Sequence, residues 1–125
     1  QARGYFISAG GSRPARDITL VPTVTIDALA AEYRVTPTHL KIDVEGDEAS
    51  VLAGARATLT AGGRRPTVFL ELHNDILRAR GEAPGRVLQE LGAWGYRLEA
   101  PSGAPLTADA AVGPRVTRLV ALPSE

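Results

Sequence analysis

The stretch HLKIDVEG, from His39 to Gly46, decides the fold because it reads as a strand with a turn at its end. The strand covers His39–Val44, and Gly46 ends it. Apolar residues then recur at helical spacing over Asp47–Ala61, and a second strand, TVFLELH, covers Thr67–His73. A strand, a helix and a strand in this order predict a βαβ unit with two parallel strands.

Upstream of this unit, the chain is expected to be extended. Gly4–Ser8 and Ile18–Ile26 are rich in β-branched and aromatic residues, and the polar, glycine-rich segment Ala9–Arg16 between them is typical of a loop. Asp27 stands where a helix N-cap belongs. We therefore expect an irregular or extended lead-in over residues 1–23, followed by a βαβαββ core over residues 24–125.

Downstream, the sequence predicts one further helix and two closing strands. The helix covers about Pro84–Trp94, and the strands cover Tyr96–Ala100 and Val116–Leu122, with a loop rich in Pro, Gly and Ala between them. No helix precedes the last strand, so that strand should run antiparallel to the others. The predicted fold is α/β: a mostly parallel sheet with a last antiparallel strand, about half of a doubly wound fold in a single partial domain.

The composition excludes several classes of function. The 125 residues contain 14 basic and 14 acidic residues, and this neutral balance argues against a nucleic-acid or membrane partner. With no cysteine, the sequence has no disulfide and no thiol nucleophile. Because it shows neither an apolar run of about 20 residues nor a signal-peptide pattern, we expect a cytoplasmic protein. It also contains no methionine, so we expect it not to begin at its own start codon.

Charged residues lie where a central parallel strand is normally apolar on both faces. Lys41, Asp43 and Glu45 share one face of the first strand, and Glu71 and His73 stand at the same end of the next. Because ligands bind in the crevice beyond the carboxyl ends of parallel strands, we expect these side chains to form a site there.

Lys41 is the one Lys in a sequence whose other basic residues are Arg. A Lys is a compact point charge that fits beside a carboxylate inside a strand, whereas Arg is bulky and planar. We therefore expect Lys41 to orient Asp43 and to keep it ionised. The alternative is a structural ion pair of Lys41 with Asp43 or Glu71, with His73 and Glu48 capping nearby loops.

Other chemistries find less support. Asp43, Glu71 and His73 carry oxygen and imidazole groups that suit Mg, Mn or Fe, but no spacing signature supports a metal site, and we predict none. The sequence also lacks the G-x-S-x-G turn of serine hydrolases and the G-x-G-x-x-G and G-x-x-x-x-G-K loops that bind phosphate groups.

Four segments, in this order, resemble the FkbM family of methyltransferases: VTIDAL at Val24–Leu29, LKIDVEGDE at Leu40–Glu48, VLAGA at Val51–Ala55 and FLELH at Phe69–His73. The second and third are the most specific, because they are long and ungapped. The resemblance covers about Val24–Tyr96. It implies a class I, Rossmann-like methyltransferase fold that uses S-adenosylmethionine, usually for O-methylation of a sugar or natural-product hydroxyl.

The same resemblance implies what the sequence lacks. In that family's fold, a glycine loop after the first strand holds the methionine part of the cofactor. Ser8–Ser12 is glycine-rich but has neither the pattern of that loop nor its following helix. By this comparison we expect the C-terminal half of a larger enzyme, inactive alone, whose partners are a small-molecule or glycan acceptor and the missing N-terminal half of its own domain.

The resemblance also implies roles for the charged residues. Asp43 would lie beside the cofactor's methyl group and the acceptor hydroxyl, and Glu45 and Glu48 would frame the following loop. Glu71 and His73 would face the acceptor, with His73 or Asp43 as the base. Two alternatives stay open: a non-catalytic α/β binding module, and a metal-dependent hydrolase built on Asp43, Glu71 and His73.

Overall fold

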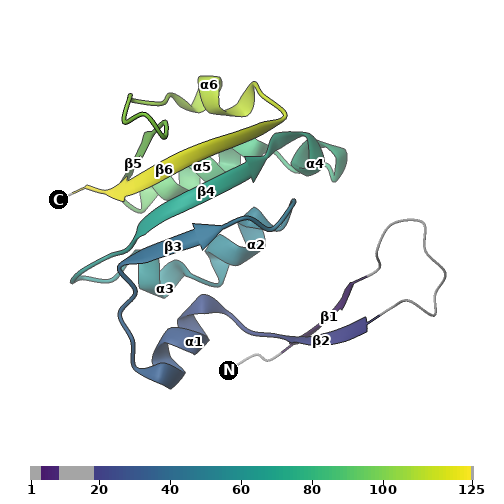
Figure 1. Cartoon of the computed structure of the whole chain (residues 1–125), viewed down its shortest axis with the longest axis vertical. Coiled ribbons are helices and arrows are strands. Elements are labelled where there is room, and N and C mark those ends of the chain that lie inside the picture. The colour runs from purple at the N-terminus through teal and green to yellow at the C-terminus, as the bar shows by residue number, and fades with distance from the viewer. Residues whose placement is uncertain (1–3, 9–18, 125) are drawn as a thin grey trace.

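The computed structural model describes residues 4–8 and 19–124, so the loop expected at Ala9–Arg16 lies outside the described residues. The described residues form six strands and six helices (Figure 1). In chain order these are β1 (Gly4–Ser8), β2 (Thr19–Thr23), α1 (Ile26–Tyr33), β3 (His39–Ile42), α2 (Glu48–Ala53), α3 (Arg56–Leu59), β4 (Thr67–His73), α4 (Asn74–Ala79), α5 (Pro84–Ala93), β5 (Tyr96–Glu99), α6 (Ala108–Val112) and β6 (Val116–Pro123).

The main sheet has four strands in the order β3-β4-β6-β5, and β1 and β2 form a separate antiparallel pair. β3 and β4 are parallel, as expected for the βαβ unit. β6 is antiparallel to both of its neighbours, so the antiparallel last strand is confirmed. The expectation of a mostly parallel sheet is wrong, because β6 inserts between β4 and β5 and makes two of the three strand pairs antiparallel.

Helices cover one face of this sheet and leave much of the other open. Figure 1 shows α2, α3 and α5 behind the sheet. Alternate strand residues such as Leu70, Leu72 and Leu119 point to that face and are buried against helical residues such as Leu52 and Leu91. Their neighbours point the other way, so Phe69 is 43% exposed. Although Val68, Phe69 and Leu70 are apolar in succession, a pattern typical of a strand covered on both faces, β4 is therefore covered on one face only.

The segment expected to be one helix, Asp47–Ala61, is two short helices that meet at Gly54. A Cβ atom on Gly54 would lie 3.1 Å from Cβ of Thr25, so the chain before α1 packs closely at this break. Thr25, not Asp27, caps α1: its hydroxyl accepts the Ala28 N–H at 3.0 Å.

The Asp27 carboxylate instead stabilises the start of α3. It accepts the Ala57 N–H at 2.9 Å and the Thr58 N–H at 2.8 Å, two donors that a helix start leaves free. The sequence predicts Asp27 at the start of a helix. The Asp27 side chain does cap a helix start, but that helix lies about thirty residues further along the chain.

Two short helices were not predicted, α4 and α6, because neither is long enough to show a hydrophobic period. The buried Asn74 joins them: its amide donates to the Ala111 carbonyl at 2.8 Å and to Thr117 Oγ1 at 3.2 Å. These hydrogen bonds hold the start of α4 at the end of the sheet where the charged residues lie. Within the described part of the chain, every helix is too short or too polar to cross a membrane.

Candidate active site

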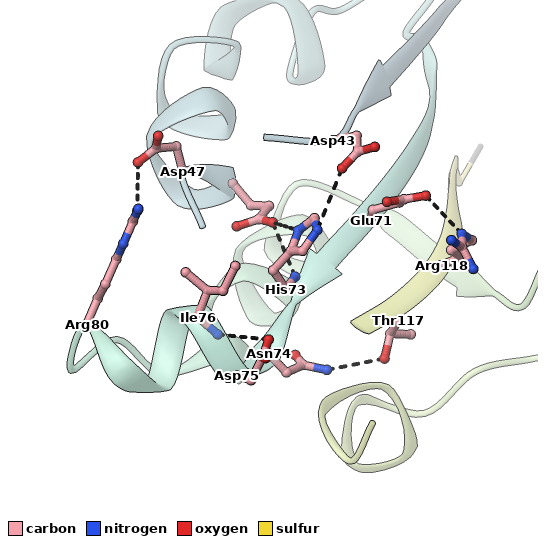
Figure 2. Close-up of polar contacts among 11 residues, drawn as sticks. Asp43, Asp47, Glu71, His73, Asn74, Asp75, Ile76, Arg80, Thr117 and Arg118 are labelled. Atoms are coloured by element: carbon pink, nitrogen blue, oxygen red, sulfur yellow. Dashed lines mark hydrogen bonds and ion pairs between the residues drawn. The ribbon is translucent and has the colours of Figure 1, made fainter. Parts of the chain in front are cut away.

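Three of the predicted site residues meet at the carboxyl ends of β3 and β4. Ile42 pairs with Leu70, so the next residues along these parallel strands, Asp43 and Glu71, are neighbours. One side-chain atom from each of Asp43, Glu71 and His73 lies within 4.8 Å of the others (Figure 2). The structure therefore brings together the cluster that we expected from the parallel arrangement of these strands.

His73 is held by a buried carboxylate. Its Nδ1 lies 2.5 Å from Oε1 of Glu48, and its backbone N–H donates to the same oxygen at 3.2 Å. Glu48 is fully buried, and the His73 side chain is only 10% exposed. Because a carboxylate accepts hydrogen bonds, Nδ1 carries the proton, and the Nε2 lone pair of the neutral ring faces the cluster.

Nε2 of His73 lies 3.6 Å from Oδ1 of Asp43 (Figure 2). Burial by itself would lower the pKa of His73, but the hydrogen bond and charge of Glu48, with the charges of Asp43 and Glu71, outweigh it and raise the pKa above the usual histidine range. The ring is thus a stronger base than an exposed histidine, and its cationic form is stabilised on two sides.

Glu71 has a cationic partner on β6. Residues 71 and 118 are opposite each other in the antiparallel pair β4–β6, and Arg118 Nε donates to Glu71 Oε1 at 2.8 Å. This hydrogen bond lowers the pKa of Glu71 below its usual range, so the carboxylate stays charged at neutral pH. Arg118 is largely exposed and lies on the open face of the sheet.

The loop between β3 and α2 is fixed by close packing and an ion pair. Gly46 has φ +107°, and a Cβ atom there would lie 2.6 Å from Ile76 Cγ2. Asp47 Oδ1 lies 2.9 Å from Arg80 Nη1, which ties the loop to the end of α4 (Figure 2). Glu45 adopts the left-handed conformation with φ +49° and is exposed. Glu45 does not belong to the cluster that Asp43, Glu71 and His73 form in the described residues.

Lys41 does not orient Asp43. Its side chain is exposed, and within the described part of the chain it forms no ion pair with Asp43 or Glu71. The expectation failed because it assumed a strand covered on both faces, where a charge needs a partner. On the open face of the sheet, Lys41 is exposed and needs no partner, and Arg118 supplies the cation that pairs with Glu71.

A shallow groove runs along this open face beside the cluster. It has a volume of about 340 Å³, and its lining includes Lys41, Phe69, Glu71, Arg118 and Val120. The Phe69 ring stacks on His39 with 6.0 Å between ring centroids and remains partly exposed. A second, larger cavity of about 510 Å³ lies between β2 and the β3–α2 loop, with Val21, Val44 and Val51 among its lining residues.

Sequence reasoning missed the roles of Glu48 and Arg118. The signal for Glu48 was present: Glu48, Leu52, Ala55 and Leu59 follow helical spacing and are all buried, so Glu48 occupies a core position. A carboxylate at such a position needs a partner. The pairing of Arg118 with Glu71 depends on β6 inserting next to β4, which no local pattern indicates.

This arrangement can accept a proton from a hydroxyl group. A buried carboxylate fixes the tautomer of an imidazole, the free nitrogen points toward a partly exposed carboxylate, and a groove leads to both. Such a geometry suits general-base catalysis, in which a positioned imidazole removes the proton of a reacting group.

Comparison with known proteins gives one match. A family model described as the methyltransferase FkbM domain matches residues 4–98, which is more than half of the 125 residues. No curated protein and no solved structure matches the chain. The matched range runs from β1 into β5 and therefore includes Asp43, Glu48, Glu71 and His73.

Proposed function

The chain belongs to the FkbM methyltransferase domain family, and on this basis we propose that it methylates a hydroxyl group of a sugar or natural product with S-adenosylmethionine as the donor. The observation that supports the choice of a hydroxyl is the Glu48–His73 pair, whose free Nε2 faces Asp43. A hydroxyl needs to lose its proton when its oxygen is methylated, and a held imidazole provides a base for it.

The cluster suits one part of the cofactor. When bound, S-adenosylmethionine supplies an electrophilic methyl group on a positively charged sulfonium. Asp43 is the residue that we propose beside that charge, because its carboxylate is partly exposed at the tip of β3. In the described residues no glycine-rich turn joins a strand to a helix, so the proposed contribution of this region is to the methyl-transfer end of the cofactor.

The open face of the sheet is the proposed acceptor surface. Phe69 offers a flat apolar ring there, and Glu71 and Arg118 offer an acceptor and donors of hydrogen bonds at the edge of the same groove. Sugars and hydroxylated natural products combine apolar faces with hydroxyl groups, and such a surface is complementary to both.

His73 is the proposed proton acceptor. Its Nε2 takes the proton that the acceptor hydroxyl loses, which leaves an imidazolium between Glu48 and Asp43. Glu48 does not touch the acceptor; it is a positioning residue that fixes the ring and stabilises its positive charge.

The test is methyl transfer by the protein expressed from its complete gene, with labelled S-adenosylmethionine and a panel of sugars and hydroxylated natural products. His73→Asn removes Nε2 but keeps a donor near the position of Nδ1 for Glu48. We expect it and Asp43→Asn to lower kcat/KM by about 100-fold or more. The control Glu99→Gln changes a carboxylate that pairs with Arg97 on β5 and should leave kcat/KM unchanged. Near-normal turnover by both site variants would refute the proposal.

A further inference from the structure

The same three side chains form a second kind of site. We infer that Asp43, Glu71 and His73 bind one divalent cation of the borderline class, such as Zn²⁺ or Co²⁺, in place of a proton on Nε2 of His73. This inference differs from the expectation from the sequence, in which no spacing pattern indicates a metal site. It rests on the geometry of the cluster, and cation binding does not depend on the proposed methyl transfer.

The separations fit a metal ion. Metal–nitrogen and metal–oxygen bonds of about 2.0–2.2 Å place ligand atoms roughly 3 to 4 Å apart. The ligand atoms of Asp43, Glu71 and His73 all lie within 4.8 Å of one another. The Asp43 side chain is 42% exposed, so a small rotation of it can close the remaining distance without disturbing the core.

The state of His73 points independently to a ligand. The side chain is nine-tenths buried, yet Nε2 has no hydrogen bond within the described residues, since its nearest partner, Asp43 Oδ1, is 3.6 Å away. Its Nδ1 is bound to Glu48, which lies outside the proposed ligand set. Metal-binding histidines almost always donate their other ring N–H to a carboxylate or carbonyl in this way, which orients the ring and raises its basicity.

The ligand set selects the class of cation. One imidazole and two carboxylates suit Zn²⁺ and its neighbours, whereas Mg²⁺ and Ca²⁺ prefer oxygen ligands throughout. Arg118 opposes binding, because its guanidinium already holds Glu71 at 2.8 Å and adds a positive charge next to the site. The side chain is largely exposed, so the cation can displace it.

Cation binding has a consequence for the proposed reaction. A metal ion on Nε2 of His73 occupies the lone pair that would take the acceptor's proton. We therefore expect Zn²⁺ to inhibit methyl transfer.

The test is calorimetric titration of the metal-free protein with Zn²⁺, without cofactor or acceptor. We expect about one ion per chain. In His73→Asn and Asp43→Asn we expect the affinity for Zn²⁺ to fall by about tenfold or more. His39→Gln is the matched control, because His39 is the other histidine of the chain and lies exposed at the start of β3. In NMR spectra, paramagnetic Co²⁺ should perturb the ring signals of His73 strongly and those of His39 weakly.

A further test uses a variant that leaves the buried Glu48–His73 pair unchanged. Arg118→Gln lies on the open face of the sheet and should tighten Zn²⁺ binding, because it removes the competing cation from Glu71. Absence of binding to the wild-type protein, or binding that persists unchanged in His73→Asn, would overturn the inference. Zn²⁺ binding in a protein that shows no methyl transfer would leave the cation site standing and would count against the proposed function alone.

Discussion

At the scale of single residues, the buried Glu48 explains why the site is ordered. A carboxylate without exposure is costly unless it has a partner, and Glu48 has two donors from one residue, His73. Its second oxygen, Oε2, is buried without a hydrogen-bond partner among the described atoms. The fold therefore bears an electrostatic cost at this position, as proteins often do where a group serves function rather than stability.

The raised pKa of His73 predicts a pH dependence of stability. The folded state binds the His73 proton more tightly than the unfolded chain, whose histidine pKa is about 6.5. The resulting stabilisation is fully present below that value and is lost as pH rises through the higher pKa of the folded state. Urea unfolding across this pH range should show a falling free energy of unfolding in the wild-type protein. In His73→Asn that part of the decline should be absent, and an unchanged decline would assign it to other groups.

Glu48→Gln separates the charge of Glu48 from its hydrogen bond. The amide oxygen can still accept from Nδ1 of His73, but the negative charge that helps to raise the pKa of His73 is gone. We expect the pKa of His73 to fall toward or below the usual histidine value. NMR titration measures it directly, and because the chain has 2 histidines, the exposed His39 provides a reference in the same spectrum. A pKa that stays raised in Glu48→Gln would show that Asp43 and Glu71 dominate.

Single residues also show how much of the candidate site could be predicted from the sequence. Asp43, Glu71 and His73 were predictable, because strand ends in a βαβ unit share one edge of the sheet. Lys41 was assigned a role on the assumption of a covered face, which the three-dimensional arrangement does not provide. Arg118 was beyond reach, because it meets Glu71 through a strand that lies far away in the sequence.

At the scale of elements, the loop between β3 and α2 connects the site to the packing of α4. Gly46 lies against Ile76, and Asp47 pairs with Arg80, so two contacts hold the loop that follows Asp43. The local sequence predicted β4 with its observed bounds, because Pro66 leads directly into an apolar run that starts at Val68. It missed the break at Gly54, which comes from packing against Thr25.

Two glycine substitutions should change stability in opposite directions. Gly46→Ala forces a side chain into a positive φ and against Ile76, and we expect a loss of about 2 kcal/mol. Gly85→Ala lies in α5, where an added Cβ meets nothing within 4 Å, and it should gain about 0.7 kcal/mol from helix propensity. Chemical denaturation of both variants measures the difference. Equal stabilities would mean that the loop relaxes around the added methyl group.

At the scale of the whole molecule, β3 is the outer strand of the sheet and pairs with β4 alone in the described part of the chain. Figure 1 places β2 and α1 on this side of the sheet. Large apolar side chains are exposed in and around these elements: Leu20, Val21, Val24, Leu29, Tyr33 and Val35. A free strand edge beside exposed apolar groups favours association between chains.

We therefore expect this chain to self-associate as its concentration rises. Leu29→Glu together with Tyr33→Glu should weaken association, because both side chains are exposed on α1. Val116→Glu is the matched control, since Val116 is similarly exposed but lies on β6. Sedimentation or light scattering over a range of concentrations gives the mass of each species. A wild-type chain that stays monomeric throughout would contradict the expectation.

The place of β6 in the sheet has a consequence for how the protein is made. β5 reaches the sheet only through β6, and β6 also supplies the second partner of β4. During synthesis, β5 leaves the ribosome before the strand with which it pairs exists. Its backbone N–H and C=O groups then lack their sheet partners until residues 116–123 emerge. Loss of that last strand would thus remove the middle of the sheet and leave β5 without a neighbour, which would make the chain a target for quality control.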